Sequence, residues 1–283
     1  MVSHQGCSRR IIMRVKILID NCSSIDNPCL NSEHGLSVYV ESGGVCFLCD
    51  MGLSEKYREN ASLMGVDLSA ANFAFVSHGH NDHTGGLTDF LSVYPGVSVY
   101  LSPEVLAHKY YSTRHVERRD ISTSQDVALK YGDRLRFVED SQWVNENIAI
   151  VKCESNRYSK PQGNRFLMKD AEKDDFAHEL SIAIKVENGL VIISSCSHCG
   201  AMNIIESCRQ FTKVDRVEAF IGGLHFVDGE WTDAEVAQFM ADVEQCYAHT
   251  KFYIGHCTGS QAKQLLAPYP NINIFHTGTE ITL

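Results

Sequence analysis

Short runs of apolar residues recur along the chain, and each run is bounded by glycine, asparagine, serine or aspartate. Runs of about four to eight residues that are rich in β-branched and aromatic side chains are typical of strands. In the first half, Gly43-Gly44 separates two such runs and predicts a hairpin turn. The strands expected in this half cover residues 15–20, 36–41, 45–49, 72–77 and 97–101.

The second half repeats this pattern, with Asn188-Gly189 as its hairpin signal. The strands expected here cover residues 148–153, 180–186, 190–194, 217–221 and 252–254. Helices are expected at 54–64, with Ser54 as N-cap, at 201–211, and after Thr232, where Glu235 has the spacing of a capping box. Hairpins followed by alternating strands and helices predict an α/β fold of two mixed β-sheets flanked by helices.

Length and composition fit one domain with a sizeable core. Of the 283 residues, 44% are hydrophobic and 21% are charged, and no linker or internal repeat is evident. Because Met13 directly precedes the first strand, we expect residues 13–283 to form the domain and residues 1–12 to be a flexible extension. No apolar run approaches the ~18 residues of a membrane span.

The net charge and the cysteine content limit which binding partners and which cellular compartment we expect. The formal net charge of −10 argues against nucleic acid as a partner, and no membrane partner is expected. Eleven cysteines without a secretory signal indicate a reducing cytoplasm and free thiols. Cys46 and Cys49 have C-x-x-C spacing, but residues three apart in a strand face opposite sides, so a shared zinc ion is not expected.

Polar side chains that suit catalysis or metal binding follow several of the expected strands. Five of them come just after such a strand: Asp50, His78, His198, His225 and His256. Open α/β sheets bind their ligands at the carboxyl ends of the strands. We therefore expect these five side chains to converge on one site.

The densest group of such side chains is the run His78-Gly79-His80-Asn81-Asp82-His83. His78 and His80 can point the same way, because alternate side chains of an extended segment share a face. The chain then bends, and Asp82 and His83 turn toward a second position. Imidazole with carboxylate suits Zn, Mn or Fe in the 2+ state. Three glycines permit close backbone approach around the ions: Gly79, Gly85 and Gly86.

This run resembles the metal-binding signature of the metallo-β-lactamase superfamily, and Asp50 matches the aspartate after its second-strand hairpin. Other segments extend the likeness over residues 20–259: 20–21, 33–37, 196–198, 221–225 and 253–259. Together they resemble the branch typified by 7,8-dihydropterin-6-methyl-4-(β-D-ribofuranosyl)aminobenzene-5′-phosphate synthase and related metal-dependent hydrolases. The resemblance implies an αββα sandwich with a two-metal site at one edge.

The resemblance also implies two divalent metal ions, with zinc favoured and manganese or iron as alternatives. The ligands that carry over are His78 and His80 for the first ion and Asp82, His83 and His256 for the second. Most of the superfamily has a bridging aspartate near the position where this chain has Cys196-Ser197-His198. We expect His198, rather than His178, to be the remaining ligand. Cys196 would be a thiolate donor or, in the preferred interpretation, an inert buried thiol.

The candidate catalytic residues are Asp82, Asp50 and His225. Asp50 would orient the water or a metal ligand, and His225 would bind substrate or act as acid or base. Two cations roughly 3.5–4 Å apart lower the pKa of a shared water. The resemblance thus implies a hydrolase that acts through a metal-bound hydroxide on an anionic small molecule, such as a phosphate ester. The alternatives are a pterin-linked transferase and a non-catalytic metal or ligand sensor.

Substrate specificity is expected in residues 108–173, which we interpret as a substrate-capping insertion. This segment concentrates basic side chains in an acidic protein: Arg114, Arg118, Arg119, Arg157, Lys160 and Arg165. Arginine and lysine are suited to phosphate, and Tyr110, Tyr111 and Tyr158 would stack on a ring such as a pterin. The expected partner is a small molecule, phosphorylated or pterin-like, and the alternative is an ordinary solvated loop.

Overall fold

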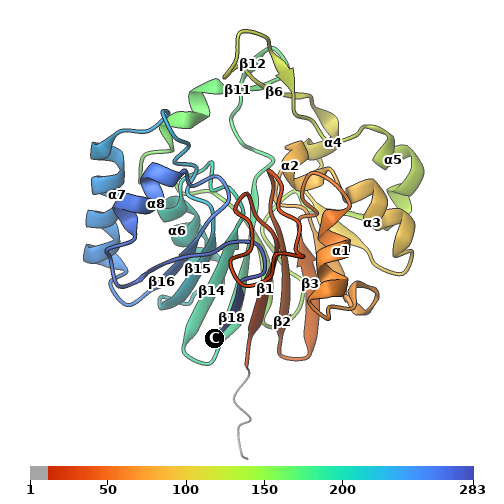
Figure 1. The fold of residues 1–283 in the computed structure, drawn as a ribbon, viewed down its shortest axis with the longest axis horizontal. Helices are drawn as coiled ribbons and strands as arrows, with labels where there is room; N and C mark the ends of the chain where they lie inside the picture. The colour runs from red at the N-terminus through yellow and green to blue at the C-terminus, as the bar shows by residue number, and fades with distance from the viewer. Residues whose placement is uncertain (1–11) are drawn as a thin grey trace, which may run out of the picture.

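The computed structural model describes residues 12–283, so the expected N-terminal extension lies outside the described residues apart from Ile12. Two β-sheets lie face to face in the middle of the molecule, and helices cover the outer face of each sheet (Figure 1). The αββα sandwich expected from the sequence is therefore confirmed. No helix in residues 12–283 has both the length and the apolar composition that crossing a membrane requires.

Each sheet has seven strands within residues 12–283, in the orders β18-β1-β2-β3-β4-β5-β8 and β17-β16-β15-β14-β13-β10-β9. The first contains β1 (Arg14–Ile19), β2 (Ser37–Ser42), β3 (Val45–Cys49), β4 (Phe73–Phe75), β5 (Val99–Leu101), β8 (Leu135–Phe137) and β18 (Glu280–Thr282). The second contains β9 (Gln142–Trp143), β10 (Ile148–Lys152), β13 (Leu180–Val186), β14 (Gly189–Ser194), β15 (Val217–Gly222), β16 (Lys251–Ile254) and β17 (Ile272–Ile274). Strands β3, β4, β5 and β8 run parallel, as do β14, β15, β16 and β17, so each set ends at one edge.

The helices cover the outer faces of the two sheets (Figure 1). On the side of the first sheet lie α1 (Lys56–Leu63), α2 (Asn81–Thr84), α3 (Leu87–Val93), α4 (Glu104–Ala107) and α5 (Asp126–Tyr131). On the side of the second sheet lie α6 (Ala201–Thr212), α7 (Asp233–Cys246) and α8 (Ser260–Leu266). Single 3-10 turns span Leu68–Ala70, Gly132–Arg134 and Gln162–Phe166.

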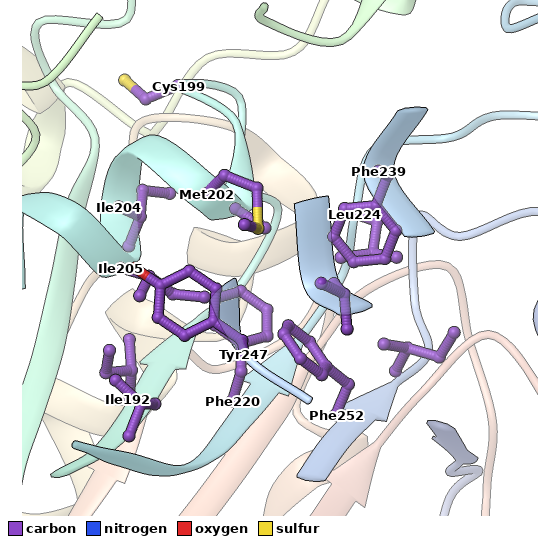
Figure 2. Close-up of a cluster of buried hydrophobic side chains, with 14 of the residues drawn as sticks. Ile192, Cys199, Met202, Ile204, Ile205, Phe220, Leu224, Phe239, Tyr247 and Phe252 are labelled. Carbon is purple, nitrogen blue, oxygen red and sulfur yellow. The ribbon is translucent and has the colours of Figure 1, made fainter. Parts of the chain in front are cut away.

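The central strands β10, β13 and β14 of the second sheet are buried on both faces, because each face meets a different apolar layer. In β10, Ile148 and Ile150 pack between the two sheets, whereas Ala149 and Val151 face the helices. This alternation is the period of two that a strand imposes. Figure 2 shows the helix-facing layer, in which aromatic side chains of β15 and β16 meet α6 and α7: Phe220, Phe252, Met202 and Phe239. The arrangement explains why these strands appear in the sequence as almost continuous apolar runs.

A small third sheet lies over one end of the sandwich, at the top of Figure 1. It consists of β6 (Tyr110–Ser112), β7 (Arg119–Asp120), β11 (Leu167–Lys169) and β12 (Glu172–Lys173). The expected insertion at 108–173 is therefore not continuous. Its central part supplies β8 to the first main sheet and β9 and β10 to the second, because apolar runs such as Ile148–Lys152 have both faces to bury.

Of the two helix N-caps predicted from the sequence, one is confirmed and the other is wrong. Thr232 caps α7, and its side chain accepts a hydrogen bond from the Glu235 backbone N–H, as expected. Ser54 as the N-cap of α1 was wrong, since the helix begins at Lys56 after Glu55. The Ser54 hydroxyl donates instead to Glu33 Oε2 at 2.6 Å, a charge-assisted bond that competes with capping.

The C-x-x-C pair in β3 behaves as the strand period requires. Cys49 packs between the sheets, whereas Cys46 packs against the outer layer of the first sheet. The expectation that they face opposite sides is confirmed. The cysteines within residues 12–283 are all free thiols.

Gly85 and Gly86, which were expected to permit close backbone approach around the ions, pack against the segment after Asp50 instead. A Cβ atom on Gly85 would lie 2.0 Å from the backbone oxygen of Leu53, and one on Gly86 would lie 2.5 Å from that of Met51. Neither contact can be relieved by turning a side chain, because the opposing atoms are backbone. The loop that carries the motif therefore lies directly against the segment after Asp50.

We predict that Gly85→Ala lowers the free energy of unfolding by about 1–3 kcal/mol, the usual cost of overpacking. Gly96→Ala is the matched control, since a Cβ there has no described atom within 4 Å. Urea denaturation followed by circular dichroism measures both variants. Equal midpoints for the two would contradict the packing described for Gly85.

Candidate metal centre

The side chains expected to converge do so at one edge of the sandwich. Asp50 follows β3, His78 follows β4, and the remaining three follow β14, β15 and β16; all are buried: His198, His225 and His256. Asp50, His225 and His256 have backbone φ angles of 58°, 53° and 46°. Residues other than glycine seldom adopt this left-handed region, and such strain concentrates at functional sites.

Three imidazoles form the first group of donors. One nitrogen from each of His78, His80 and His198 lies within 4.8 Å of the others. The Nε2 atoms of all three are buried and have no hydrogen-bond partner among residues 12–283. Burial lowers the pKa of each ring, strongly so for His78 and His198, and neighbouring histidines lower these two further. Neutral rings with an unused lone pair are what a metal ion requires.

A second group lies beside the first and includes a carboxylate. His83 Nε2 is 3.0 Å from His256 Nε2, and Asp82 Oδ2 is 3.5 Å from His83 Nε2 and 3.4 Å from His256 Nε2. Burial lowers the pKa of His83, but the carboxylates of Asp82 and Asp50 outweigh it and raise that pKa to about 10. Burial would raise the pKa of Asp82, yet His83 and His256 hold it well below its usual range. A cation between these three groups would replace the shared proton.

Both groups therefore fit divalent cations. Nitrogen donors dominate the first, and the second adds an oxygen donor, a set that suits Zn, Mn or Fe in the 2+ state. The structure brings His198 rather than His178 to the first group. His178 is otherwise engaged, because its Nδ1 accepts from the Gly79 backbone N–H at 2.9 Å and its Nε2 lies 3.1 Å from Asp174.

Cys196 lies between the two groups, where the superfamily's bridging aspartate was expected. Its Sγ is 3.2 Å from His83 Nε2. It also lies within 4.8 Å of donor atoms of His78, and of His256 together with Cys257. Burial raises the pKa of the Cys196 thiol well above its usual value, and a nearby cation would favour the thiolate. Cys196 Sγ thus lies close to donor atoms of both groups.

The Asp50 side chain is fully buried, so it has no surface in the cleft, and it contacts the His83 ring. Its Oδ2 lies 2.7 Å from His83 Nδ1 and accepts hydrogen bonds from the hydroxyls of Ser77 and Ser195. The Ser77 backbone N–H donates to Oδ1. This geometry fixes the His83 ring with Nε2 toward the cation position. Of the two roles expected for Asp50, the structure fits the orientation of a ligand rather than of water.

Several residues that position the ligands were not singled out from the sequence. Glu179, buried between strands, accepts backbone N–H bonds from His198 and Cys199, each at 2.7 Å. Asn164 lies 3.1 Å from His198 Nδ1 through Oδ1 and donates to the His198 carbonyl. An isolated acid or amide carries no spacing signal, so only the fold could reveal these contacts.

Asp20-Asn21, part of the motif set noted in the sequence, supports the other side of the centre. The His256 backbone N–H donates to Asp20 Oδ2 at 2.6 Å. Asn21 Oδ1 lies 3.0 Å from His256 Nδ1, and its Nδ2 lies 3.2 Å from His34 Nδ1. His34 Nε2 lies 3.4 Å from Asp82 Oδ2 at the rim. The loop after β1 therefore orients one ligand and partly covers another.

A cleft of about 450 Å³ opens onto the centre and is lined by His80, Asp82, Cys196, His198 and His256. His225 forms part of its wall, and its ring centroid is 4.3 Å from that of His198. Burial, and then the charge of Arg114, lower the pKa of His225 well below its usual value. His225 is therefore a neutral imidazole beside the first group.

Arg114, from the small third sheet's β6–β7 connection, reaches across this cleft. Its Nε and Nη2 donate to Glu230 at 2.6 and 3.0 Å, and Nη2 also lies 3.3 Å from His225 Nε2. His115 and Arg119 line the same side of the cleft. Arg118 and Arg157 do not, since they lie over the rings of Tyr111 and Tyr158. Only part of the basic segment thus faces the centre.

Comparison with known proteins agrees with this geometry. The family model of the metallo-beta-lactamase superfamily matches residues 31–152. The chain is 24% identical over 262 residues to 7,8-dihydropterin-6-methyl-4-(beta-D-ribofuranosyl)-aminobenzene-5′-phosphate synthase of Methanocaldococcus jannaschii, covering 83% of this chain and 84% of that protein. It is also 24% identical over 273 residues to an uncharacterized protein of the same organism, covering 93% and 98%.

A solved structure of a metal-dependent hydrolase of the beta-lactamase superfamily matches with a TM-score of 0.79 and 27% sequence identity. The match covers 96% of this chain and 99% of the other. The family match includes the whole His78–His83 run, and the likeness in fold extends over both sheets. The chain therefore resembles the metallo-β-lactamase superfamily, and within it the branch of the synthase.

Proposed function

We propose that this protein is a metal-dependent hydrolase of an anionic small molecule, with phosphate esters as the favoured substrates. The observation that carries the proposal is the first donor group, in which three buried Nε2 atoms lack a partner among the described residues. The second group, with the Asp82 carboxylate, lies directly beside it on the floor of an open cleft. A non-catalytic role would not require a cleft that reaches both groups.

Two divalent cations bound here would polarise an ester oxygen and favour loss of a proton from water near neutral pH. His78, His80 and His198 would hold one of them, and the other would lie among the second group: Asp82, His83 and His256. Cys196 would donate to both, since its Sγ lies close to donor atoms of each group. We favour zinc, because imidazole and thiolate together are donors that zinc prefers.

The chain's own residues would orient the ester. Asp50 keeps His83 fixed, so the position of the second donor group does not depend on solvent. His225 stands between the first group and Arg114, where its neutral ring would contact a bound ester. Arg114 donates through Nε and Nη2 to Glu230, which holds the guanidinium beside the cleft, and its remaining N–H groups would bind the phosphate or carboxylate.

A pterin-linked transferase is the second candidate. Its support is the likeness over 83% of this chain to a protein named as a dihydropterin-linked synthase. Both reactions would use the same donor groups and the same cleft. They differ in whether water or a second substrate accepts the transferred group, so only substrates can separate them.

We predict that His80→Ala lowers the affinity for Zn²⁺ by on the order of 100-fold or more and abolishes metal-dependent activity, because it removes one of three donors of the first group. Elemental analysis of purified protein and calorimetric titration of Zn²⁺ into chelator-treated protein measure the loss. His249→Ala, at an exposed histidine outside the cleft, is the control. Undiminished metal binding and activity in His80→Ala would reject the proposed centre.

The substrate class is tested by a screen of metal-loaded protein. We expect turnover of bis-p-nitrophenyl phosphate or p-nitrophenyl phosphate that stops on chelation, with a lactone and a dihydropterin pyrophosphate as comparison substrates. Chromogenic release and chromatography measure the products. Turnover of the dihydropterin compound alone would favour the transferase and reject the hydrolase.

Arg114→Ala is expected to raise KM for an anionic ester by about 10- to 100-fold, since a hydrogen bond to a charged group is worth about 1.5–3 kcal/mol. KM for a neutral ester should change little. Arg136→Ala, whose guanidinium bonds the Asp133 and Leu135 carbonyls, is the control. The double variant Arg114→Ala/Glu230→Gln removes the unpaired carboxylate left behind. Equal effects on charged and neutral esters would contradict the role given to Arg114.

A further inference from the structure

A buried carboxylate and a histidine outside the two donor groups contact the loop that carries two of the proposed ligands. Asp174 follows β12 and His178 precedes β13, and neither side chain has any exposed surface. Asp174 Oδ2 lies 3.1 Å from His178 Nε2, and His178 Nδ1 lies 2.9 Å from the backbone nitrogen of Gly79. The two side chains therefore form a chain of hydrogen bonds that ends between His78 and His80.

The hydrogen bond to Gly79 determines where the His178 ring carries its hydrogen. A backbone N–H can only donate, so Nδ1 accepts and has no hydrogen. The neutral ring then carries its hydrogen on Nε2 and donates it to Asp174. Asp174 Oδ1 accepts from the Phe176 backbone N–H at 2.8 Å, so both carboxylate oxygens are acceptors. An amide at position 174 could not serve both donors, because one of its two ends is itself a donor.

The Gly79 peptide is held from several sides. Gly79 is buried, and its carbonyl accepts from the backbone N–H and the hydroxyl of Thr123, each at 3.1 Å. A Cβ atom on Gly79 would lie 2.5 Å from Tyr110 Cε2. Without His178 Nδ1, the Gly79 N–H would lose this acceptor while buried, which is costly. The backbone between His78 and His80 would then shift toward another partner.

The residue between the two side chains contacts the third proposed ligand of the first group. The Phe176 ring stacks on the His198 ring, with centroids 4.5 Å apart and planes inclined by 9°. Phe176 has a φ of 61°, a left-handed conformation that bulky residues seldom adopt. The Asp174 backbone N–H donates to the Leu167 carbonyl of β11 at 3.1 Å. Residues 174–178 therefore connect the small third sheet to all three histidines of the first group.

We propose that Asp174 and His178 are positioning residues for the first metal ion, and that they act by holding the Gly79 peptide so that His78 and His80 converge. The inference rests on the proposed function for the identity of the ligands, but it does not require hydrolysis. Donor atoms of Asp174, His178 and His80 also lie within 4.8 Å of one another. Both His178 nitrogens are already hydrogen-bonded, however, and Asp174 Oδ2 is 3.8 Å from His80 Nε2, beyond hydrogen-bond distance.

Asp174→Asn tests this role, with Asp175→Asn as the matched control. Asp175 is an exposed neighbour that pairs with Lys169, so its substitution removes the same charge and leaves the His178 contact intact. We expect the Zn²⁺ dissociation constant of the first group to rise by roughly 10- to 100-fold in Asp174→Asn and to stay nearly unchanged in Asp175→Asn. Calorimetric titration of chelator-treated full chain measures both.

The visible absorption of Co²⁺ bound in place of Zn²⁺ reports the geometry of the ligands. Its bands should shift in Asp174→Asn and not in Asp175→Asn. Unchanged affinity and spectrum in Asp174→Asn, or an equal loss in the control, would overturn the proposal.

Two substitutions of His178 separate the hydrogen bond from packing. An asparagine Oδ1 can take the place of Nδ1 and accept from the Gly79 N–H, whereas leucine fills similar space and accepts nothing. We expect His178→Asn to keep the zinc affinity and the Co²⁺ spectrum, and His178→Leu to lose both. This pair decides the matter if circular dichroism shows that Asp174→Asn does not fold. Equal behaviour of the two variants would contradict a positioning role.

The unmodified protein provides a measurement that depends on no variant folding as designed. Nitrogen-15 NMR of the zinc-loaded full chain shows which ring nitrogen of His178 carries hydrogen, and the signals absent from His178→Asn identify that ring. We expect hydrogen on Nε2 alone, and hydrogen on Nδ1 would reject the proposal. Metal binding with the predicted dependence, but without ester turnover, would reject only the proposed function. Absence of metal binding by the unmodified chain would reject both.

Discussion

The fully buried carboxylate of Asp50 connects the two sheets beneath the metal centre. It accepts bonds from Ser77 after β4 and Ser195 after β14, and it holds the His83 ring. A buried charge costs several kcal/mol unless it is paired and hydrogen-bonded. Three strand ends and one helix are therefore held in fixed relative positions around a single side chain. The ligand positions depend on this connection.

Above Asp50, the packing places more imidazole nitrogens together than hydrogen bonds among residues 12–283 satisfy. His78, His80 and His198 each keep a buried Nε2 without a partner in the described part of the chain, and burial keeps the rings neutral. A cation bound by these nitrogens, as proposed, would offset the cost of burying them without a partner and would thereby couple metal binding to stability. The left-handed backbone conformations of His225 and His256 also cost conformational free energy, and both residues lie at the same edge of the sandwich.

The side chains proposed to recognise the substrate come from the segment that overlies the sandwich, whereas the donor groups follow strands of the two main sheets. Arg114 belongs to the small third sheet, and its ion pair with Glu230 connects that sheet to the loop after β15. Asn164, from the same overlying part of the chain, orients His198. In the proposed function, residues that would recognise the substrate thus lie directly against residues that would hold the metal. Loops carried on a rigid scaffold commonly combine these roles.

The sequence by itself determined the layered α/β fold, because strand-length apolar runs and hairpin glycines fix local structure through short-range patterns. It also located Asp50, His78, His225 and His256 at strand ends, since parallel strands must end at one edge. Tertiary structure alone decided three further points. It placed Cys196 between the donor groups, assigned His178 to Asp174, and moved residues 135–152 from the expected insertion into the main sheets. These outcomes depend on contacts between residues far apart in the chain, for which spacing along the sequence carries no signal.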